Sequence, residues 1–171
     1  MKVLVAGGAG YIGSHTSVEL INAGFEVIIV DNFSNSDPSS LEGIYRITGV
    51  KPTFVEADCC DKEALRAVFK AYDFDSVIHF AAYKAVGESV EKPLMYYRNN
   101  MLSLINVLEL MQEYGRRNIV FSSSATVYGD ADMLPVTELT PRKPATSAYG
   151  NTKQMAEDIL RDSTQAYPTL S

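Results

Sequence analysis

A tyrosine and a lysine stand four residues apart in the run Tyr149-Gly150-Asn151-Thr152-Lys153. On a helix, this spacing places both side chains on one face, where they can reach a shared ligand. A free tyrosine has a pKa of about 10 and is a poor base at neutral pH, but a nearby ammonium group stabilises the phenolate. The pair is therefore suited to removing a proton from an alcohol. A surface tyrosine and lysine are the alternative interpretation, because this spacing is common by chance.

A glycine-rich loop, Gly7-Gly8-Ala9-Gly10-Tyr11-Ile12-Gly13, follows a short apolar run near the N-terminus and precedes a helical pattern. Glycine permits a tight turn and lets the backbone approach a pyrophosphate closely. The N–H groups at the start of the helix then bind the phosphate oxygens. The order strand, glycine turn, helix favours a dinucleotide site over a merely tight turn.

Two acidic residues follow later apolar runs. Asp31 ends the second run, near the spacing expected for the carboxylate that binds an adenosine ribose, and it would repel a 2′-phosphate. It therefore favours NAD over NADP, with a loop cap as the alternative. Asp58 follows the third run, where it is either an acceptor for the adenine amino group or an ordinary turn residue.

Three serines, Ser122-Ser123-Ser124, end the fifth apolar run. Ligands bind at the carboxyl edge of a doubly wound sheet. A hydroxyl there can relay a proton or polarise a substrate oxygen. On their own the serines would be assigned to a turn, but Tyr149 and Lys153 favour the chemical role.

The elements that must position these residues alternate between short β-branched runs and longer helical periods. This alternation predicts an α/β Rossmann-type fold, with a doubly wound parallel sheet and right-handed crossovers. We expect the stretch Asn32–Glu42, rich in Ser, Asn, Asp and Pro, to be a loop. The expected strands are Val3–Ala6, Phe25–Val30, Thr53–Glu56, Ser76–Phe80 and Asn118–Ser122, and the expected helices are about Ile12–Ala23, Asp61–Tyr72, Pro93–Gly115 and Ser147–Ala166.

The composition fits one domain, because 46% of the 171 residues are hydrophobic. The net charge of −6 argues against a nucleic-acid or anionic-membrane partner. No apolar run reaches the roughly 18 residues of a membrane span, and the first run is too short for a signal peptide. Cys59 and Cys60 are adjacent and poorly placed for a disulfide, and His15 and His79 show no metal spacing. We therefore expect a cytoplasmic protein with reduced thiols and no metal.

The predicted helix after Pro93 is apolar on more than one face. Met101, Leu104, Ile105, Leu108 and Met111 share one arc that can cover the sheet, whereas Leu102, Val107 and Leu110 fall outside it. These three residues need a second cover, which is either another part of the chain or a second copy in a helix-to-helix contact.

The sequence resembles the extended short-chain dehydrogenase/reductases and, within them, the UDP-glucose 4-epimerase family. The resemblance spans nearly the whole chain. The related nucleotide-sugar 4,6-dehydratases carry an Asp-Glu pair where this chain has Ala125 and Thr126, so dehydration is disfavoured. The matching segments are Gly7–His15, Val30-Asp31-Asn32, His79–Ser89, Phe121–Gly129 and Tyr149–Lys153.

The resemblance implies a bound NAD cofactor and a UDP-sugar substrate whose C4 is inverted through a 4-keto intermediate. Tyr149 would take the proton of the 4-hydroxyl, Ser124 would relay it, and Lys153 would bind the nicotinamide ribose and help to ionise Tyr149. Substrate contacts are implied for Lys84, Ser124 and Tyr149. Cofactor contacts are implied for Gly7, Gly10, Tyr11, Ile12, Gly13, Asp31, Asn32, Phe33, Ser34, Asn35, Ser36, Asp58, Cys59, Phe80, Ala81, Ala82, Lys84, Asn99, Ser122, Tyr149 and Lys153.

The resemblance also implies a homodimer, formed through the helices that follow Pro93 and Ser147. Family members continue beyond this length, and the chain ends where the alternation calls for another strand. We therefore expect residues 1–171 to be one incomplete NAD-binding Rossmann domain without the substrate domain. The alternatives are another nucleotide-sugar epimerase or oxidoreductase of the extended family, such as a uronate epimerase, or an NAD-binding fragment without catalysis.

Overall fold

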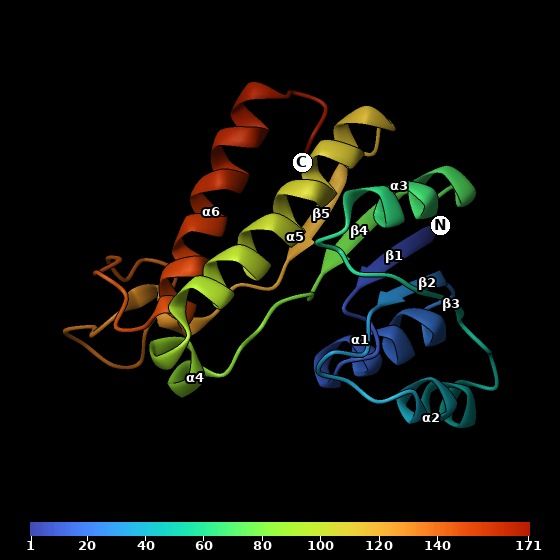
Figure 1. Cartoon of the computed structure of the whole chain (residues 1–171), viewed down its shortest axis with the longest axis horizontal. Coiled ribbons are helices and arrows are strands. Elements are labelled where there is room, and N and C mark those ends of the chain that lie inside the picture. Colours follow the sequence, from blue (N-terminus) through green and yellow to red (C-terminus); the bar gives the residue numbers. More distant parts are fainter.

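In the computed structural model, which describes residues 1–171, a five-stranded parallel sheet lies between two layers of helices (Figure 1). The strand order is β3-β2-β1-β4-β5, so the chain moves outward in one direction, crosses back past β1 and then moves outward in the other. This is the doubly wound arrangement that the alternating sequence predicts. The strands are β1 (Lys2–Ala6), β2 (Glu26–Asp31), β3 (Thr53–Glu56), β4 (Ser76–His79) and β5 (Asn118–Phe121).

Helices α1 and α2 cover one face of the sheet. Because side chains alternate along a strand, Val3 and Val5 of β1 point to this face together with Val27 and Ile29 of β2. Ile44 of α2 completes this smaller core. The helices on this side are α1 (Tyr11–Asn22) and α2 (Ser39–Thr48).

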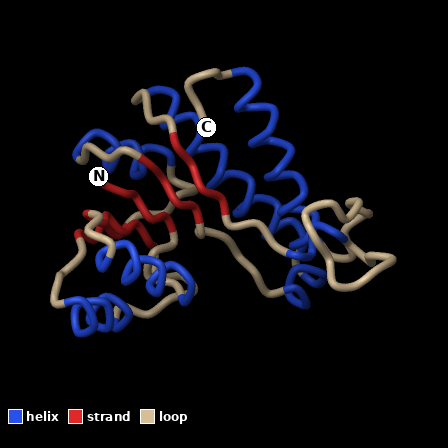
Figure 2. The backbone as a smooth tube through the Cα atoms, turned by 180° about the vertical axis from the view of Figure 1, so that it is seen from behind, coloured by secondary structure: helices blue, strands red, loops and turns tan.

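The larger core lies on the other face, beneath three helices. Leu4 and Ala6 of β1 and Ile28 and Val30 of β2 point to this side. Figure 2 shows from behind that two long helices of this layer run side by side. The helices of this side are α3 (Lys62–Ala71), α5 (Pro93–Glu113) and α6 (Ala148–Ala166), and the short α4 (Val86–Glu91) and the 3-10 helix η1 (Ala125–Tyr128) lie in the connections.

The strand register aligns the carboxyl ends of the strands. Ala6 lies opposite Val30 on one side and His79 on the other, and His79 lies opposite Phe121. The loops that follow β1, β2, β4 and β5 therefore all leave the sheet at one edge. These loops carry most of the residues that the sequence assigns to chemistry.

The predicted strands and long helices are confirmed, but the prediction of a loop over Asn32–Glu42 is wrong at its C-terminal end. Helix α2 begins at Ser39, and the Asp37 carboxylate accepts a hydrogen bond from the Ser39 N–H at 2.8 Å. Ser, Asp and Pro favour helix starts as well as turns, which is why composition alone misassigns this stretch. The helix α4 and the 3-10 helix η1 were not predicted either.

The apolar residues of α5 are covered mostly by the chain itself. Val107 and Leu110, which fall outside the predicted arc, are fully buried in the larger core. Ile105, which we placed in the sheet-facing arc, is instead 37% exposed, and Leu102 is 39% exposed. Leu102 and Ile105 are therefore left without full cover, as are Leu94 and Met95 in the first turn of α5.

The last residue, Ser171, lies beside β5. Its N–H donates to the Arg117 carbonyl at 2.6 Å, and its own carbonyl accepts from the Ile119 N–H at 2.9 Å. Among the helices, none is both long and apolar enough to cross a membrane.

Candidate active site

A cavity of about 310 Å³ opens at the carboxyl edge of the sheet. Its walls come from the loops after all five strands and from helices α1, α5 and α6. The structure thus gathers nearly all of the predicted site residues at one place. The predicted residues that line it are Gly7, Gly10, Tyr11, Ile12, Gly13, Asp31, Asn32, Ser34, Asn35, Ser36, Asp58, Cys59, Phe80, Ala81, Ala82, Lys84, Asn99, Ser122, Ser124, Tyr149 and Lys153.

The glycine loop needs its glycines for two separate reasons. Gly7 has a φ of +77°, and a Cβ there would lie 2.7 Å from the backbone nitrogen of Ala81. Gly13 has no such φ, but a Cβ on it would lie 2.3 Å from the Gly7 carbonyl oxygen. Neither position therefore has room for a side chain. Helix α1 starts after Gly10, and no side chain caps its first N–H groups.

Asp31, at the end of β2, joins the glycine loop to the loop that follows β2. Its Oδ2 accepts from the Ala9 N–H at 3.0 Å, and its Oδ1 accepts from the Phe33 N–H at 3.0 Å and the Ser36 hydroxyl at 2.8 Å. Phe33 is the one predicted residue that does not line the cavity, because its ring packs against Phe54, 4.9 Å away between centroids.

Asp58 fits both interpretations that the sequence leaves open. Its Oδ1 accepts from the Cys60 N–H at 2.7 Å, as in a turn, and the residue also lines the cavity. The two cysteines are free thiols, as expected, and Cys59 is buried. Burial, and next the charge of Asp58, raise the pKa of each thiol to about 12. Neither cysteine is therefore a nucleophile at neutral pH.

The opposite end of the cavity is formed by the first turns of α6. The Ser147 hydroxyl caps this helix by accepting from the Gly150 N–H at 3.1 Å, which places Tyr149 in the first turn. The Lys153 ammonium donates to the Ser122 carbonyl at 2.7 Å and lies 4.6 Å above the Phe121 ring. It lies 5.8 Å from the centre of the Tyr149 ring. The predicted juxtaposition of tyrosine, lysine and strand-end serines is therefore present.

Burial lowers the pKa of Lys153 to about 8. Behind it, His79 is 1% exposed, and neither ring nitrogen has a hydrogen-bond partner. Burial, and next the Lys153 charge, lower the pKa of His79 to about 4. The imidazole is therefore neutral at pH 7 and adds no second positive charge to the site.

Ser124 lines the cavity with a hydroxyl group that acts as an acceptor within the chain. Its oxygen accepts from the Thr126 N–H at 3.3 Å and from the Thr126 hydroxyl at 3.0 Å. Because a hydroxyl has two acceptor positions and one donor, the Ser124 proton remains available for another oxygen. This arrangement suits a relay between Tyr149 and an alcohol.

The cavity wall also contains five residues to which the sequence analysis gave no individual role, although Ser123 was named within the serine run. Four are direct neighbours of predicted residues along the chain. Ser103 is different: it lies one turn after Asn99 on α5, and its hydroxyl donates to the Ala81 carbonyl at 3.2 Å. Helical spacing from Asn99 is the signal that could have found it. The five residues are Val30, Ala57, Tyr83, Ser103 and Ser123.

The donor set fits a dinucleotide. The glycine cradle leaves room for a pyrophosphate beside the uncapped start of α1, and Asp31 supplies a carboxylate acceptor near the loop after β2. Lys153 and Tyr149 stand where the same cavity continues towards the strand-end serines.

A family model described as GDP-mannose 4,6 dehydratase matches residues 4–170. The chain belongs to this family. Relatives that share about 50% of their residues with this chain are named UDP-glucose 4-epimerase, which differs from the description of the family model. UDP-glucose 4-epimerase of Haemophilus influenzae is 50% identical to this chain. The match covers 100% of this chain and 51% of the relative. UDP-glucose 4-epimerase of Bacillus subtilis is 54% identical, with 95% of the chain and 48% of the relative covered.

A solved relative shares the fold closely. The crystal structure of UDP-glucose 4-epimerase from Bifidobacterium longum in complex with NAD+ and UDP matches with a TM-score of 0.98 and 47% identity. The match covers 100% of this chain and 51% of that one. The chain thus spans about half the length of the curated relatives it matches. The Rossmann-type assignment made from the sequence is confirmed, and this member of the family matches the N-terminal half of those epimerases.

Proposed function

We propose that the protein carrying this chain is an NAD-dependent isomerase that inverts C4 of UDP-glucose and UDP-galactose. The observation that carries the proposal is one cavity that joins the glycine loop and Asp31 to Ser124, Tyr149 and Lys153. The relatives named UDP-glucose 4-epimerase, one of them solved with NAD+ and UDP, support the same assignment.

The proposed cofactor contacts follow from the shape of the cavity. The N–H groups that start α1 hold the pyrophosphate, Asp31 accepts from the adenosine ribose, and the Lys153 ammonium binds the other ribose. Lys84 and Asn99 line the wall between these ends. When bound, NAD supplies a reversible hydride acceptor next to the sugar C4.

The residues of this chain supply the proton transfer. The Tyr149 phenolate takes the proton of the sugar 4-hydroxyl through Ser124 and returns it when the opposite epimer forms. The Lys153 ammonium, 5.8 Å from the centre of the Tyr149 ring, and the N-terminal end of α6 both place positive charge beside this side chain. The neutral His79 keeps a single cation at this point.

Dehydration is the activity that the family model's description names, and the local residues disfavour it. Ala125 has no polar side chain. The Thr126 hydroxyl is engaged with Ser124 at 3.0 Å and is no acid or base at neutral pH. The acid–base pair that eliminates water is therefore missing after the strand-end serines.

Two measurements test the proposed function. Calorimetric titration of NAD+ into the cofactor-free chain is expected to show saturable, near one-to-one binding. In the protein carrying this chain, Tyr149→Phe is expected to lower the turnover of UDP-galactose by at least about 100-fold and to leave NAD affinity nearly unchanged. Unchanged turnover in Tyr149→Phe contradicts the assigned role. Turnover of a UDP-uronate instead of UDP-galactose favours another epimerase of the extended family.

A fragment that binds NAD without catalysis is the second candidate. NAD binding without any turnover of UDP-sugars distinguishes this case. The presence of Ser124, Tyr149 and Lys153 in one cavity argues for an ancestry of catalysis.

We further propose a homodimer formed through α5 and α6. Leu102 and Ile105 lie three residues apart on α5 and are both more than a third exposed, as is Met155 on α6. Burying them between two copies removes apolar surface from water. Sedimentation is expected to show dimers for the parent and monomers for the double variant Leu102→Glu/Ile105→Glu. The free thiols support a cytoplasmic location.

A further inference from the structure

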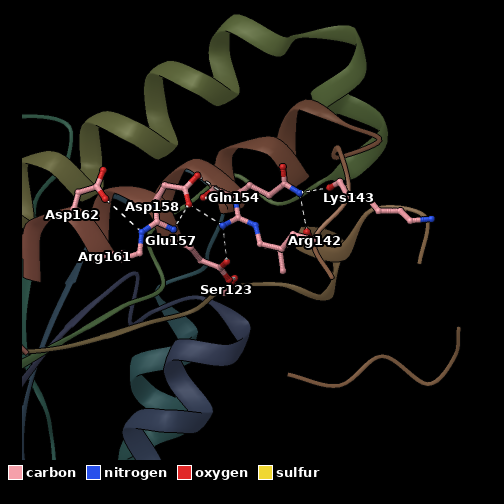
Figure 3. A network of polar contacts seen from close by, with 9 residues as sticks. Ser123, Arg142, Lys143, Gln154, Glu157, Asp158, Arg161 and Asp162 are labelled. Atoms are coloured by element: carbon pink, nitrogen blue, oxygen red, sulfur yellow. Dashed lines mark hydrogen bonds and ion pairs between the residues drawn. The ribbon is translucent and has the colours of Figure 1, made fainter. Parts of the chain in front are cut away.

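We infer that Glu157 is a positioning residue, which acts through Ser123 to hold the strand-end serines against the helix that carries Tyr149 and Lys153. The inference rests on the proposed function, since it assigns a role within the same site. Figure 3 shows Glu157 on α6 with Ser123 beside it and the Arg142 side chain reaching towards the helix from the loop before it.

Glu157 continues the catalytic face of α6. It follows Lys153 by four residues and Tyr149 by eight, so the three side chains project from successive turns of one helical face. The Ser123 hydroxyl donates to Glu157 Oε1 at 2.5 Å. The preceding residue, Ser122, accepts from Lys153 Nζ at 2.7 Å. Two consecutive residues after β5 are thus bound by two consecutive turns of α6.

These two contacts fix the residue that follows them. With Ser122 and Ser123 both tied to α6, the backbone that leads into Ser124 has little freedom to rotate. The Ser124 oxygen then accepts from Thr126, which leaves the Ser124 proton free to be donated to another oxygen. Glu157 therefore sets the position of the relay hydroxyl relative to Tyr149, although Glu157 itself does not line the cavity.

Arg142 holds Glu157 in place. Its Nη1 lies 3.8 Å from Glu157 Oε2 and donates to Asp158 Oδ1 at 2.8 Å, and its Nη2 donates to the Gln154 carbonyl at 3.1 Å. The guanidinium is therefore anchored to α6 at three residues and presents a positive charge to the far oxygen of Glu157. This leaves Oε1 directed to Ser123.

Asp158 provides a matched comparison. It is the next residue on α6, it binds the same guanidinium, and it also pairs with Arg161 at 2.8 Å. It has no contact with the serines. If Glu157 only holds the Arg142 loop against α6, replacing Asp158 should lower turnover as much as replacing Glu157. If Glu157 positions the serines, only replacements of Glu157 and Ser123 should lower turnover.

The kinetic experiment compares variants of the protein carrying this chain, with NAD and UDP-galactose. Because small displacements of reacting groups are costly, Ser123→Ala and Glu157→Ala are each expected to lower kcat about 10-fold, with KM and NAD affinity within about twofold of the parent. Glu157→Gln keeps an acceptor oxygen for Ser123 and is expected to recover most of kcat. Asp158→Ala is expected to stay within about twofold of the parent.

The double variant Ser123→Ala/Glu157→Ala adds a sharper comparison. If both residues act through their shared hydrogen bond, the double variant is no slower than Glu157→Ala alone. Multiplied losses in the double variant, or an equal loss in Asp158→Ala, overturn the inference.

A labelling experiment decides the inference without turnover. Loss of the hydrogen bond between Ser123 and Glu157 loosens the adjacent residue Ser122. The Ser122 carbonyl then holds the Lys153 ammonium less firmly. The rate at which acetic anhydride acetylates Lys153, followed by peptide mass spectrometry, is therefore expected to rise about 10-fold in Ser123→Ala and Glu157→Ala but not in Asp158→Ala. Unchanged labelling in both former variants overturns the inference. Absence of turnover in the parent contradicts the proposed function instead and leaves this labelling result to stand.

Discussion

Gly7, in the loop after β1, lies so close to Ala81, in the loop after β4, that a Cβ on Gly7 would be 2.7 Å from the Ala81 backbone nitrogen. The variant Gly7→Ala combines this clash with a φ of +77°. We expect it to lower the free energy of unfolding by about 2–4 kcal/mol and to weaken NAD binding by at least about 100-fold. Urea unfolding and calorimetric titration measure the two effects.

Gly24 offers a matched control for this variant. Its φ of +86° is as unfavourable for alanine as that of Gly7, but no atom lies within 4 Å of a Cβ there. Gly24→Ala is expected to cost only about 1 kcal/mol of stability and to leave NAD affinity unchanged. Equal losses of NAD affinity in both variants would contradict the importance of the contact with Ala81.

The carboxylate of Asp31 is expected to be indispensable as an acceptor. In Asp31→Asn, one face of the side chain becomes a donor, so either the Ala9 N–H or the Phe33 N–H loses its acceptor. We expect NAD affinity to fall by about 10-fold or more and the preference for NAD over NADP to narrow. Asp37→Asn is the control, because Asp37 caps the Ser39 N–H outside the cavity. An equal loss in the control would contradict the assignment.

The buried Lys153 predicts a specific pH dependence of stability. Its pKa is about 8 in the folded chain and returns to its ordinary 10.5 on unfolding. Below about pH 8 the side chain is charged in both states, and the cost of burying the charge is present in full. As the pH rises towards 10.5, the folded state loses the proton first, so this cost is relieved and the folded state gains stability.

The variant Lys153→Met isolates that contribution. We expect its stability relative to the parent to fall by about 2 kcal/mol between about pH 7 and about pH 9.5, because only the parent gains from deprotonation. Urea unfolding of both proteins at the two pH values measures the difference. A difference that does not change with pH would show that Lys153 is not buried as described.

The two cysteines are expected to be unreactive in the folded chain. With the pKa of each thiol near 12, less than about one molecule in a thousand carries a thiolate at pH 8. Reaction with a disulfide reagent is expected to be at least about 100-fold slower in buffer than in urea. Fast modification of Cys60, the less buried of the two, would contradict this prediction.

The strands were predictable because continuous β-branched runs favour buried strands over other structures. The run Val27-Ile28-Ile29-Val30 is buried on both faces, and burial on both faces is what a continuous β-branched run indicates. Helix α4 was not predictable, because six residues give too short a pattern. It is held by tertiary contacts instead, since Tyr96 accepts from the Ala85 N–H at 3.1 Å and donates to Glu88 at 2.9 Å.

In the site too, some residues were predictable from the sequence pattern and others depend on tertiary packing. Residues at strand ends, such as Asp31 and Ser124, could be assigned because parallel strands deliver their carboxyl ends to one edge. Ser103 was missed although its helical spacing from Asn99 was a usable signal, because only the packing of α5 against the loop after β4 shows which face of that helix meets the cavity. The ring of Phe33 packs on Phe54 outside the cavity wall, which the resemblance alone does not indicate, and its assignment to the cofactor stays a prediction.

The acceptor that holds the Lys153 ammonium is a main-chain carbonyl, that of Ser122. A main-chain acceptor is present whatever amino acid occupies the position. The side chain at position 122 can therefore be exchanged to reshape the cavity wall while the lysine keeps its anchor. Position 122 is therefore a place on the cavity wall where other side chains can be tried without removing the acceptor of Lys153.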